Sequence, residues 1–166
     1  METNDPNSGG AVESDREEGL VGSFAEQLAE AFGIDASVET TRATDGTLEV
    51  VMDGADVGLL IGKRGATLAA IEELLRVILQ RQAQGRRYSK VRLEVGGYRQ
   101  RRQEALESFA RRVADDVAAT GTPKILEPMN SADRKIVHDA IVAVPGVATA
   151  SEGEEPRRRV VVRPAD

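Results

Sequence analysis

Residues 60–65 read Leu-Ile-Gly-Lys-Arg-Gly, and this is the most informative stretch of the chain because two glycines enclose two basic residues. Gly62 and Gly65 lack side-chain bulk, so a sugar–phosphate backbone can approach the main chain here. An amphipathic helix is predicted to follow directly, and the first N–H groups of a helix carry partial positive charge. Lys63 and Arg64 add two cations in the middle of the loop. The pattern therefore predicts a loop that binds phosphate groups.

The segments around this loop predict a two-layer α+β body, in which helices cover one face of a small sheet. Helices are predicted where apolar residues recur every three or four positions, and strands where β-prone residues alternate or flank the turn signal Asp45-Gly46. The predicted order is helix 20–33, strands 36–42 and 47–53, a helical turn within 55–61, the loop, helix 66–85 and strand 88–95.

A smaller α+β unit is predicted to follow. A long helix from about Tyr98 to Ala119 leads into a short extended run, which contains a proline, at residues 124–129. Ser131 is a favourable N-cap for a helix over residues 132–144. Residues 147–151 and 159–163 are predicted to close the unit as a hairpin.

Two of the predicted helices carry well-marked apolar stripes, which we expect to face the core. In the first helix the predicted stripe is Leu20, Phe24, Leu28 and Phe32, with Val21, Ala25 and Ala31 alongside. In the helix that starts near Tyr98 it is Leu106, Phe109, Val113 and Val117. Tyr88 and Tyr98 each flank a strand, and we expect them to pack rather than to stack on bases.

The charge of the chain is unevenly distributed. The net charge is −6, yet residues 60–166 hold fourteen acidic and twenty basic residues, and eighteen of the 22 basic residues are arginine. Residues 1–18 hold six acidic residues and one basic residue, with little apolar content, so they are predicted to form an acidic disordered tail. The distribution predicts a basic working body with an acidic appendage.

Several functional classes are excluded by composition. The chain has no cysteine, which excludes disulfides, thiolate zinc sites and cysteine nucleophiles, and its single histidine excludes a multi-histidine metal site. No apolar run is long enough to cross a bilayer, and the N-terminal residues do not resemble a secretory signal. We therefore expect no cofactor, no metal, no membrane segment and a cytoplasmic location.

A P-loop nucleotide hydrolase is the main alternative for Gly58 to Lys63. The residues read G-x-x-x-G-K, one position short of the P-loop spacing, and Arg64 stands where Ser or Thr must contact magnesium. The adjacent acidic residues at 72–73 and 115–116 are interpreted as solvated helix faces. The sequence therefore predicts a protein that is not an enzyme.

A second basic constellation lies in the predicted helix over residues 132–144. Arg134 and His138 are four positions apart and so share one helix face, with Lys135 beside them. Downstream, residues 151–162 read SEGEEPRRRVVV. Arg157 to Arg159 are interpreted either as a solvated hairpin base or as an additional phosphate contact.

These motifs resemble two known domains. The G-x-x-G loop and its flanking elements are similar to a type II KH domain over residues 19–97, and the R-x-x-x-H helix with its flanks is similar to an R-three-H domain over residues 98–166. This pair in one small chain resembles the bacterial Jag family, also called KhpB or SpoIIIJ-associated. Only the acidic tail precedes the KH region here, whereas family members often carry an N-terminal Jag domain.

The resemblance implies a binder of single-stranded nucleic acid that acts as an RNA-binding regulator or chaperone. Its expected contacts are Gly62, Lys63, Arg64 and Gly65 in the loop, and Arg134, Lys135 and His138 in the helix. RNA is preferred over single-stranded DNA on the resemblance alone. The alternative is an interaction or scaffold protein that pairs with a small stand-alone KH protein, with RNA binding secondary.

Overall fold

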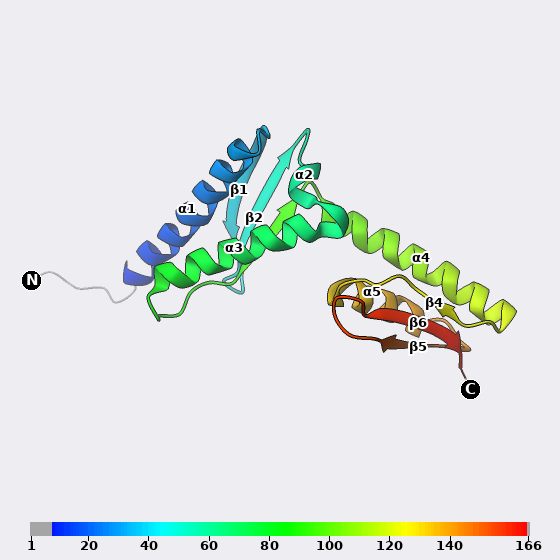
Figure 1. Ribbon diagram of the computed structural model, residues 1–166. Coiled ribbons are helices and arrows are strands. Elements are labelled where there is room, and N and C mark those ends of the chain that lie inside the picture. The colour runs from blue at the N-terminus through cyan, green and yellow to red at the C-terminus, as the bar shows by residue number, and fades with distance from the viewer. Residues whose placement is uncertain (1–7, 166) are drawn as a thin grey trace, which may run out of the picture. The chain divides into compact units, whose positions relative to one another are not determined.

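The computed structural model describes residues 8–165, with side chains from Asp15 onward. Contacts divide the chain into two compact units, the first ending at Tyr98 and the second beginning at Arg99. Each unit combines helices with one three-stranded sheet (Figure 1). The predicted α+β class is confirmed.

The first unit has the element order that the sequence predicts. Its strands lie in the order β1-β2-β3, with β1 and β2 antiparallel and β2 and β3 parallel. Helix α1 packs on β1 and helix α3 on β3, and the two helices contact each other, so both cover the same face of the sheet (Figure 1). The elements are α1 (Ser8–Ala31), β1 (Ala36–Arg42), β2 (Leu48–Gly54), α2 (Gly58–Ile61), the 3-10 turn η1 (Lys63–Gly65), α3 (Ala66–Ala83) and β3 (Val91–Val95).

The core of the first unit lies between the sheet and these helices. Alternate residues of a strand point to one face, so one side of β2 and β3 is fully buried. Tyr88 and Tyr98 pack against this core, as expected. The inward residues of the strands are Leu48, Val50 and Met52 in β2 and Leu93 and Val95 in β3.

The apolar stripe of α1 is displaced by one position from the prediction. Val21, Ala25 and Ala29 are the buried residues, while Phe24 only packs at the edge of the core and Phe32 is 47% exposed. Small residues let the helix approach the sheet closely, and this close contact determined the face that is buried. In α4 (Tyr98–Thr120) the ends of the predicted stripe, Leu106 and Val117, are buried as predicted, but between them Ala110 and Ala114 are buried in place of Phe109 and Val113. Phe109 is 39% exposed.

The predicted disordered tail is wrong for residues 8–18, which belong to α1; residues 1–7 lie outside the described part of the chain. Helix propagation beyond an established helix adds one backbone hydrogen bond per residue, so it requires little apolar content. The acidic residues also have partners, because Arg42 of β1 forms ion pairs with Glu17 and Glu18. Low apolar content therefore did not prevent order here.

The second unit is built on a sheet in the order β4-β6-β5, with both strand pairs antiparallel. Its core joins α4, α5 and β6, in which Val160 and Val162 are fully buried. No helix within residues 8–165 is both long enough and apolar enough to cross a membrane. The elements are α4, β4 (Lys124–Ile125), α5 (Ser131–Val142), β5 (Val147–Glu152) and β6 (Arg159–Pro164).

Helix α5 begins one residue earlier than predicted, and its N-cap is Asn130 rather than Ser131. The Asn130 side-chain oxygen accepts a hydrogen bond from the backbone N–H of Asp133, at 2.9 Å. Asn and Ser are nearly equivalent as N-caps, so residue preference alone could not choose between neighbours. The cap fixes the first turn, which contains Arg134.

Candidate nucleic-acid interface

The G-x-x-G loop connects α2 to α3 through three residues with left-handed φ angles. Gly62 has φ 69° and ψ −177°, Arg64 has φ 55° and ψ 28°, and Gly65 has φ 79° and ψ 16°. Residues other than glycine rarely adopt such φ values, because their Cβ atom crowds the backbone. Glycine at both ends therefore lets the chain reverse sharply between the two helices.

Close packing gives a second reason for both glycines. A Cβ atom on Gly62 would lie 2.9 Å from the backbone nitrogen of Thr67, and one on Gly65 would lie 2.7 Å from Cε1 of Tyr98. Gly65 is buried against the Tyr98 ring, which itself packs on the core of the first unit. The Tyr98 ring thus packs between the loop and the core of the first unit, and it fixes the position of the loop relative to the sheet.

The two middle residues of the loop project into solvent. Lys63 and Arg64 are both exposed, whereas Gly65 behind them is buried. The first turn of α3 contains no acidic residue. Its N-cap residue is Gly65, which has no side chain to form a capping hydrogen bond. The positive end of the helix dipole and the two cations therefore act together, which favours an anion at this position.

Arg134 is buried and fully engaged within the second unit. Its side chain is 9% exposed and forms an ion pair with Glu155, Nη2 to Oε1, at 2.6 Å. Its Nη1 atom donates to the backbone oxygen of Met129, also at 2.6 Å. Arg134 thus connects the start of α5 to the turn between β5 and β6.

His138 lies one helical turn after Arg134 and is half-buried against β5. Its Nδ1 atom is 2.6 Å from the Thr149 hydroxyl and its Nε2 atom 2.8 Å from the Ser151 hydroxyl. Burial, and then the positive charge of Arg134, lower the pKa of His138 below its ordinary value. The ring is therefore neutral near neutral pH, and it bridges two hydroxyl groups.

The remaining predicted residue of the helix differs from these two. Lys135 is exposed and pairs with Asp139 four positions later. Its neighbour Asp133 is buried, with its side chain 8% exposed, and pairs with Arg102 of α4 at 2.8 Å. The structure thus brings Arg134 and His138 together on the face toward the hairpin and leaves Lys135 in solvent.

Sequence reasoning did not identify the partners of these side chains. Glu155, Thr149 and Ser151 all belong to the stretch around SEGEEP, which contributed to the resemblance but was assigned no contact with Arg134 or His138. Glu155 is 21 residues from Arg134, and no local pattern connects such positions. The nearest sequence signal was the resemblance of residues 151–162 to the flank of an R-three-H domain.

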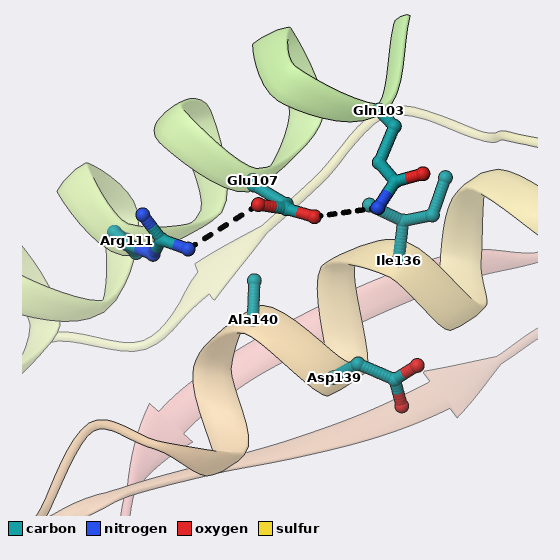
Figure 2. Close-up of a pocket in the computed structure, with 6 residues that line it drawn as sticks. All are labelled: Gln103, Glu107, Arg111, Ile136, Asp139 and Ala140. Carbon is teal, nitrogen blue, oxygen red and sulfur yellow. Dashed lines mark hydrogen bonds and ion pairs between the residues drawn. The ribbon is translucent and has the colours of Figure 1, made fainter. Parts of the chain in front are cut away.

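A groove of about 200 Å³ lies between α4 and α5 (Figure 2). Ile136 and Ala140 are its apolar lining residues. The polar side chains that line it largely form hydrogen bonds with one another. Glu107 accepts from Gln103 at 2.9 Å and from Arg111 at 3.3 Å. Among the side chains that the structure describes, from Asp15 to Ala165, no group of three or more His, Asp or Glu residues is placed to hold a metal ion.

The fold and the loop define the class of protein: a KH domain with an exposed basic G-x-x-G loop, followed by an R-three-H domain. Comparison with known families agrees, since the KH domain of KhpA and KhpB matches residues 18–94 and the R-three-H domain matches residues 104–164. The chain belongs to the KhpB family, which is also called the Jag family.

Individual relatives are similar over most of this chain. The RNA-binding protein KhpB of Clostridium symbiosum is 38% identical over 141 residues, which cover 84% of this chain and 62% of that protein. The RNA-binding protein KhpB of Bacillus subtilis is 35% identical over 141 residues, covering 84% and 66%. That of Lactiplantibacillus plantarum is 40% identical over 110 residues, covering 66% and 34%. The chain thus spans between 34% and 66% of the length of these relatives.

Proposed function

We propose that this chain is a single-stranded RNA-binding regulator or chaperone that acts in the cytoplasm and catalyses no reaction. The observation that supports it best is the loop at residues 62–65, where two exposed cations lie at the uncapped start of a long helix. Its relatives carry the name RNA-binding protein KhpB. Residues 19–97 are assigned to the KH domain and residues 98–166 to the R-three-H domain.

The loop would act on the backbone of the strand rather than on its bases. In KH domains the G-x-x-G loop clamps about four nucleotides. Here Gly62 and Gly65 allow the approach, and the side chains of Lys63 and Arg64 neutralise phosphate charge. Charge contacts of this kind carry no sequence information, so base preference must come from other residues.

The second unit supplies a further contact around Arg134, Lys135 and His138. Two linked sites on one strand raise the effective concentration of the second binding event, so modest individual affinities combine. RNA is proposed over single-stranded DNA because the relatives are named for RNA. Both nucleic acids carry the phosphates that the loop would contact.

The experiment is a binding titration of the full chain with a labelled single-stranded RNA of about twenty nucleotides. The double variant Lys63→Asp, Arg64→Asp reverses two charges in the loop, and the matched control Arg87→Asp, Lys90→Asp makes the same change at exposed positions elsewhere in the first unit. We expect the loop variant to lose at least about tenfold in affinity and the control to lose much less. Equal losses would show that net charge, not the loop, controls binding.

Pairing with a small KH-domain protein is the second candidate function. Its support is the exposure of Leu74 and Val77 on α3, which are 47% and 37% exposed. Light scattering of the chain mixed with such a protein, without RNA, measures it directly. The scaffold role is favoured if the Lys63→Asp, Arg64→Asp variant still forms a stable complex with that protein and if complex formation leaves RNA affinity unchanged.

A further inference from the structure

Three consecutive arginines, Arg157, Arg158 and Arg159, end the β5–β6 turn and begin β6. All three are exposed, and their guanidinium groups form no ion pair or hydrogen bond with any side chain or backbone that the structure describes. Their main chain, in contrast, is well held. Arg157 N donates to the oxygen of Glu154 at 2.8 Å, and the oxygen of Arg158 accepts from Met129 N at 3.2 Å.

Arg134 fixes this turn from two directions. Its Nη2 atom binds Glu155, two residues before the arginines, and its Nη1 atom binds the oxygen of Met129. Met129 in turn donates its backbone N–H to Arg158. One buried guanidinium group therefore determines the position of both sides of the turn.

His138 fixes the first strand of the same hairpin. It contacts the hydroxyl groups of Thr149 and Ser151, which are alternate residues of β5 and so point to one face. The two residues of the R-x-x-x-H pattern thus hold the turn and the strand that precedes it. Both ring nitrogens of His138 and both terminal nitrogens of Arg134 have partners within the second unit.

We propose that the β5–β6 hairpin is a phosphate-binding surface of the second unit, in which Arg157, Arg158 and Arg159 contact the nucleic-acid backbone. Arg134 and His138 are positioning residues that hold this hairpin. The inference rests on the proposed function and names the residues that make its second contact. A planar guanidinium donates paired hydrogen bonds to a phosphate, and three neighbouring guanidinium groups concentrate positive charge at this turn.

Glu155 allows a test with a distinctive sign. Simple electrostatics predicts that removing a carboxylate beside a phosphate-binding surface strengthens binding. A positioning role for Arg134 predicts weaker binding instead, because without Glu155 the Arg134 guanidinium no longer holds this part of the turn. Glu154 is a matched control, since it is the adjacent exposed acid and only its backbone oxygen is used within the described residues.

The first experiment measures RNA affinity of the full chain as a function of salt. The variant Arg157→Gln, Arg158→Gln, Arg159→Gln is compared with Arg111→Gln, Arg112→Gln, Lys124→Gln, which removes the same charge from exposed residues of the same unit outside the hairpin. We expect the hairpin variant to lose at least about tenfold in affinity. Its salt slope should fall by about two, since each phosphate contact on a single strand contributes ~0.7.

The second experiment compares Glu155→Ala, Glu155→Gln and Glu154→Ala by the same titration. We expect Glu155→Ala to weaken RNA binding several-fold and Glu154→Ala to strengthen it slightly. Glu155→Gln retains an oxygen that accepts from Arg134, so it should restore binding to the wild-type level or above. Circular dichroism of each variant checks that the fold is retained.

The outcomes separate this inference from the proposed function. If the wild type binds RNA and the hairpin variant binds it equally well, the inference alone is overturned. The same holds if the Glu155→Ala variant binds RNA more tightly than the wild type. A wild-type chain that binds no single-stranded RNA overturns the proposed function together with the inference.

Discussion

Glu17 of α1 binds Ser89, which lies 72 residues later in the chain, and so holds the middle of the helix against the segment that enters β3. The backbone N–H of Ser89 donates to Oε1 of Glu17 at 3.2 Å, and its hydroxyl donates to Oε2. Arg42 of β1 pairs with the same carboxylate. One acidic side chain thus connects α1 to both edges of the sheet.

Glu17→Ala should lower the free energy of unfolding by about 1–2 kcal/mol, because it removes charge-assisted hydrogen bonds from a mostly buried carboxylate. Glu26→Ala on the exposed side of the same helix is the control and should change stability by less than about 0.5 kcal/mol. Urea unfolding monitored by circular dichroism measures both. Equal stabilities would contradict the role of Glu17.

Gly65→Ala should lower stability by about 1–3 kcal/mol and weaken RNA binding. The added methyl group meets Tyr98 at 2.7 Å, and φ at this position is 79°. Gly58→Ala is the control, because a Cβ there meets nothing within 4 Å, and it should be neutral or slightly stabilising. Thermal unfolding and an RNA titration of both variants test this, and a Gly65→Ala chain as stable as the wild type would refute it.

Arg102→Ala should destabilise the second unit by about 3 kcal/mol, because it leaves the Asp133 carboxylate buried without its ion-pair partner. Arg111→Ala on the same helix breaks the exposed pair with Glu107, and its expected loss is below about 1 kcal/mol. Denaturant unfolding compares the two variants. Similar losses would show that burial of Asp133 does not matter.

His138 should make stability depend on pH in the acidic range. Its pKa is lowered in the folded state, by burial first and by Arg134 second, so the unfolded chain binds the additional proton. Stability therefore rises with pH through the region below about 6.5, the ordinary histidine value, and levels off above it.

The His138→Gln variant tests this dependence, since it cannot titrate in that range. The free energies of unfolding of wild type and variant, measured from pH 5 to 8, should differ in slope below pH 6.5 and run parallel above it. Parallel profiles across the whole range would mean that the folded and unfolded states bind the proton equally.

Element order followed from the sequence because hydrophobic period and turn residues are local properties. The loop at residues 62–65 was found in the same way, and the exposure of Lys63 and Arg64 followed from its position between two helices. The register of the helices did not follow. Ala25 and Ala110 are fully buried, whereas the predicted stripes were centred on Phe24 and Phe109, because apolar spacing alone does not distinguish neighbouring registers of a helix.

The role of Arg134 depended on residues far away in the sequence. The spacing of Arg134 and His138 predicts a shared face that contacts a ligand, yet the Arg134 side chain is buried and pairs with Glu155 from the β5–β6 turn. Glu17 and Glu18 are a similar case, because their ion-pair partner Arg42 lies on a strand. Such long-range pairs are not visible in local sequence patterns.

The left-handed φ of 55° at Arg64 has a consequence for how sequences of this architecture can change. A glycine or asparagine would occupy that backbone conformation at a cost lower by about 1 kcal/mol, so the backbone conformation alone favours replacement of this arginine. Under the proposed function, selection for a cation in the loop opposes that replacement. The residue at this position should therefore record whether a lineage has kept a phosphate-binding loop, even where the rest of the fold is unchanged.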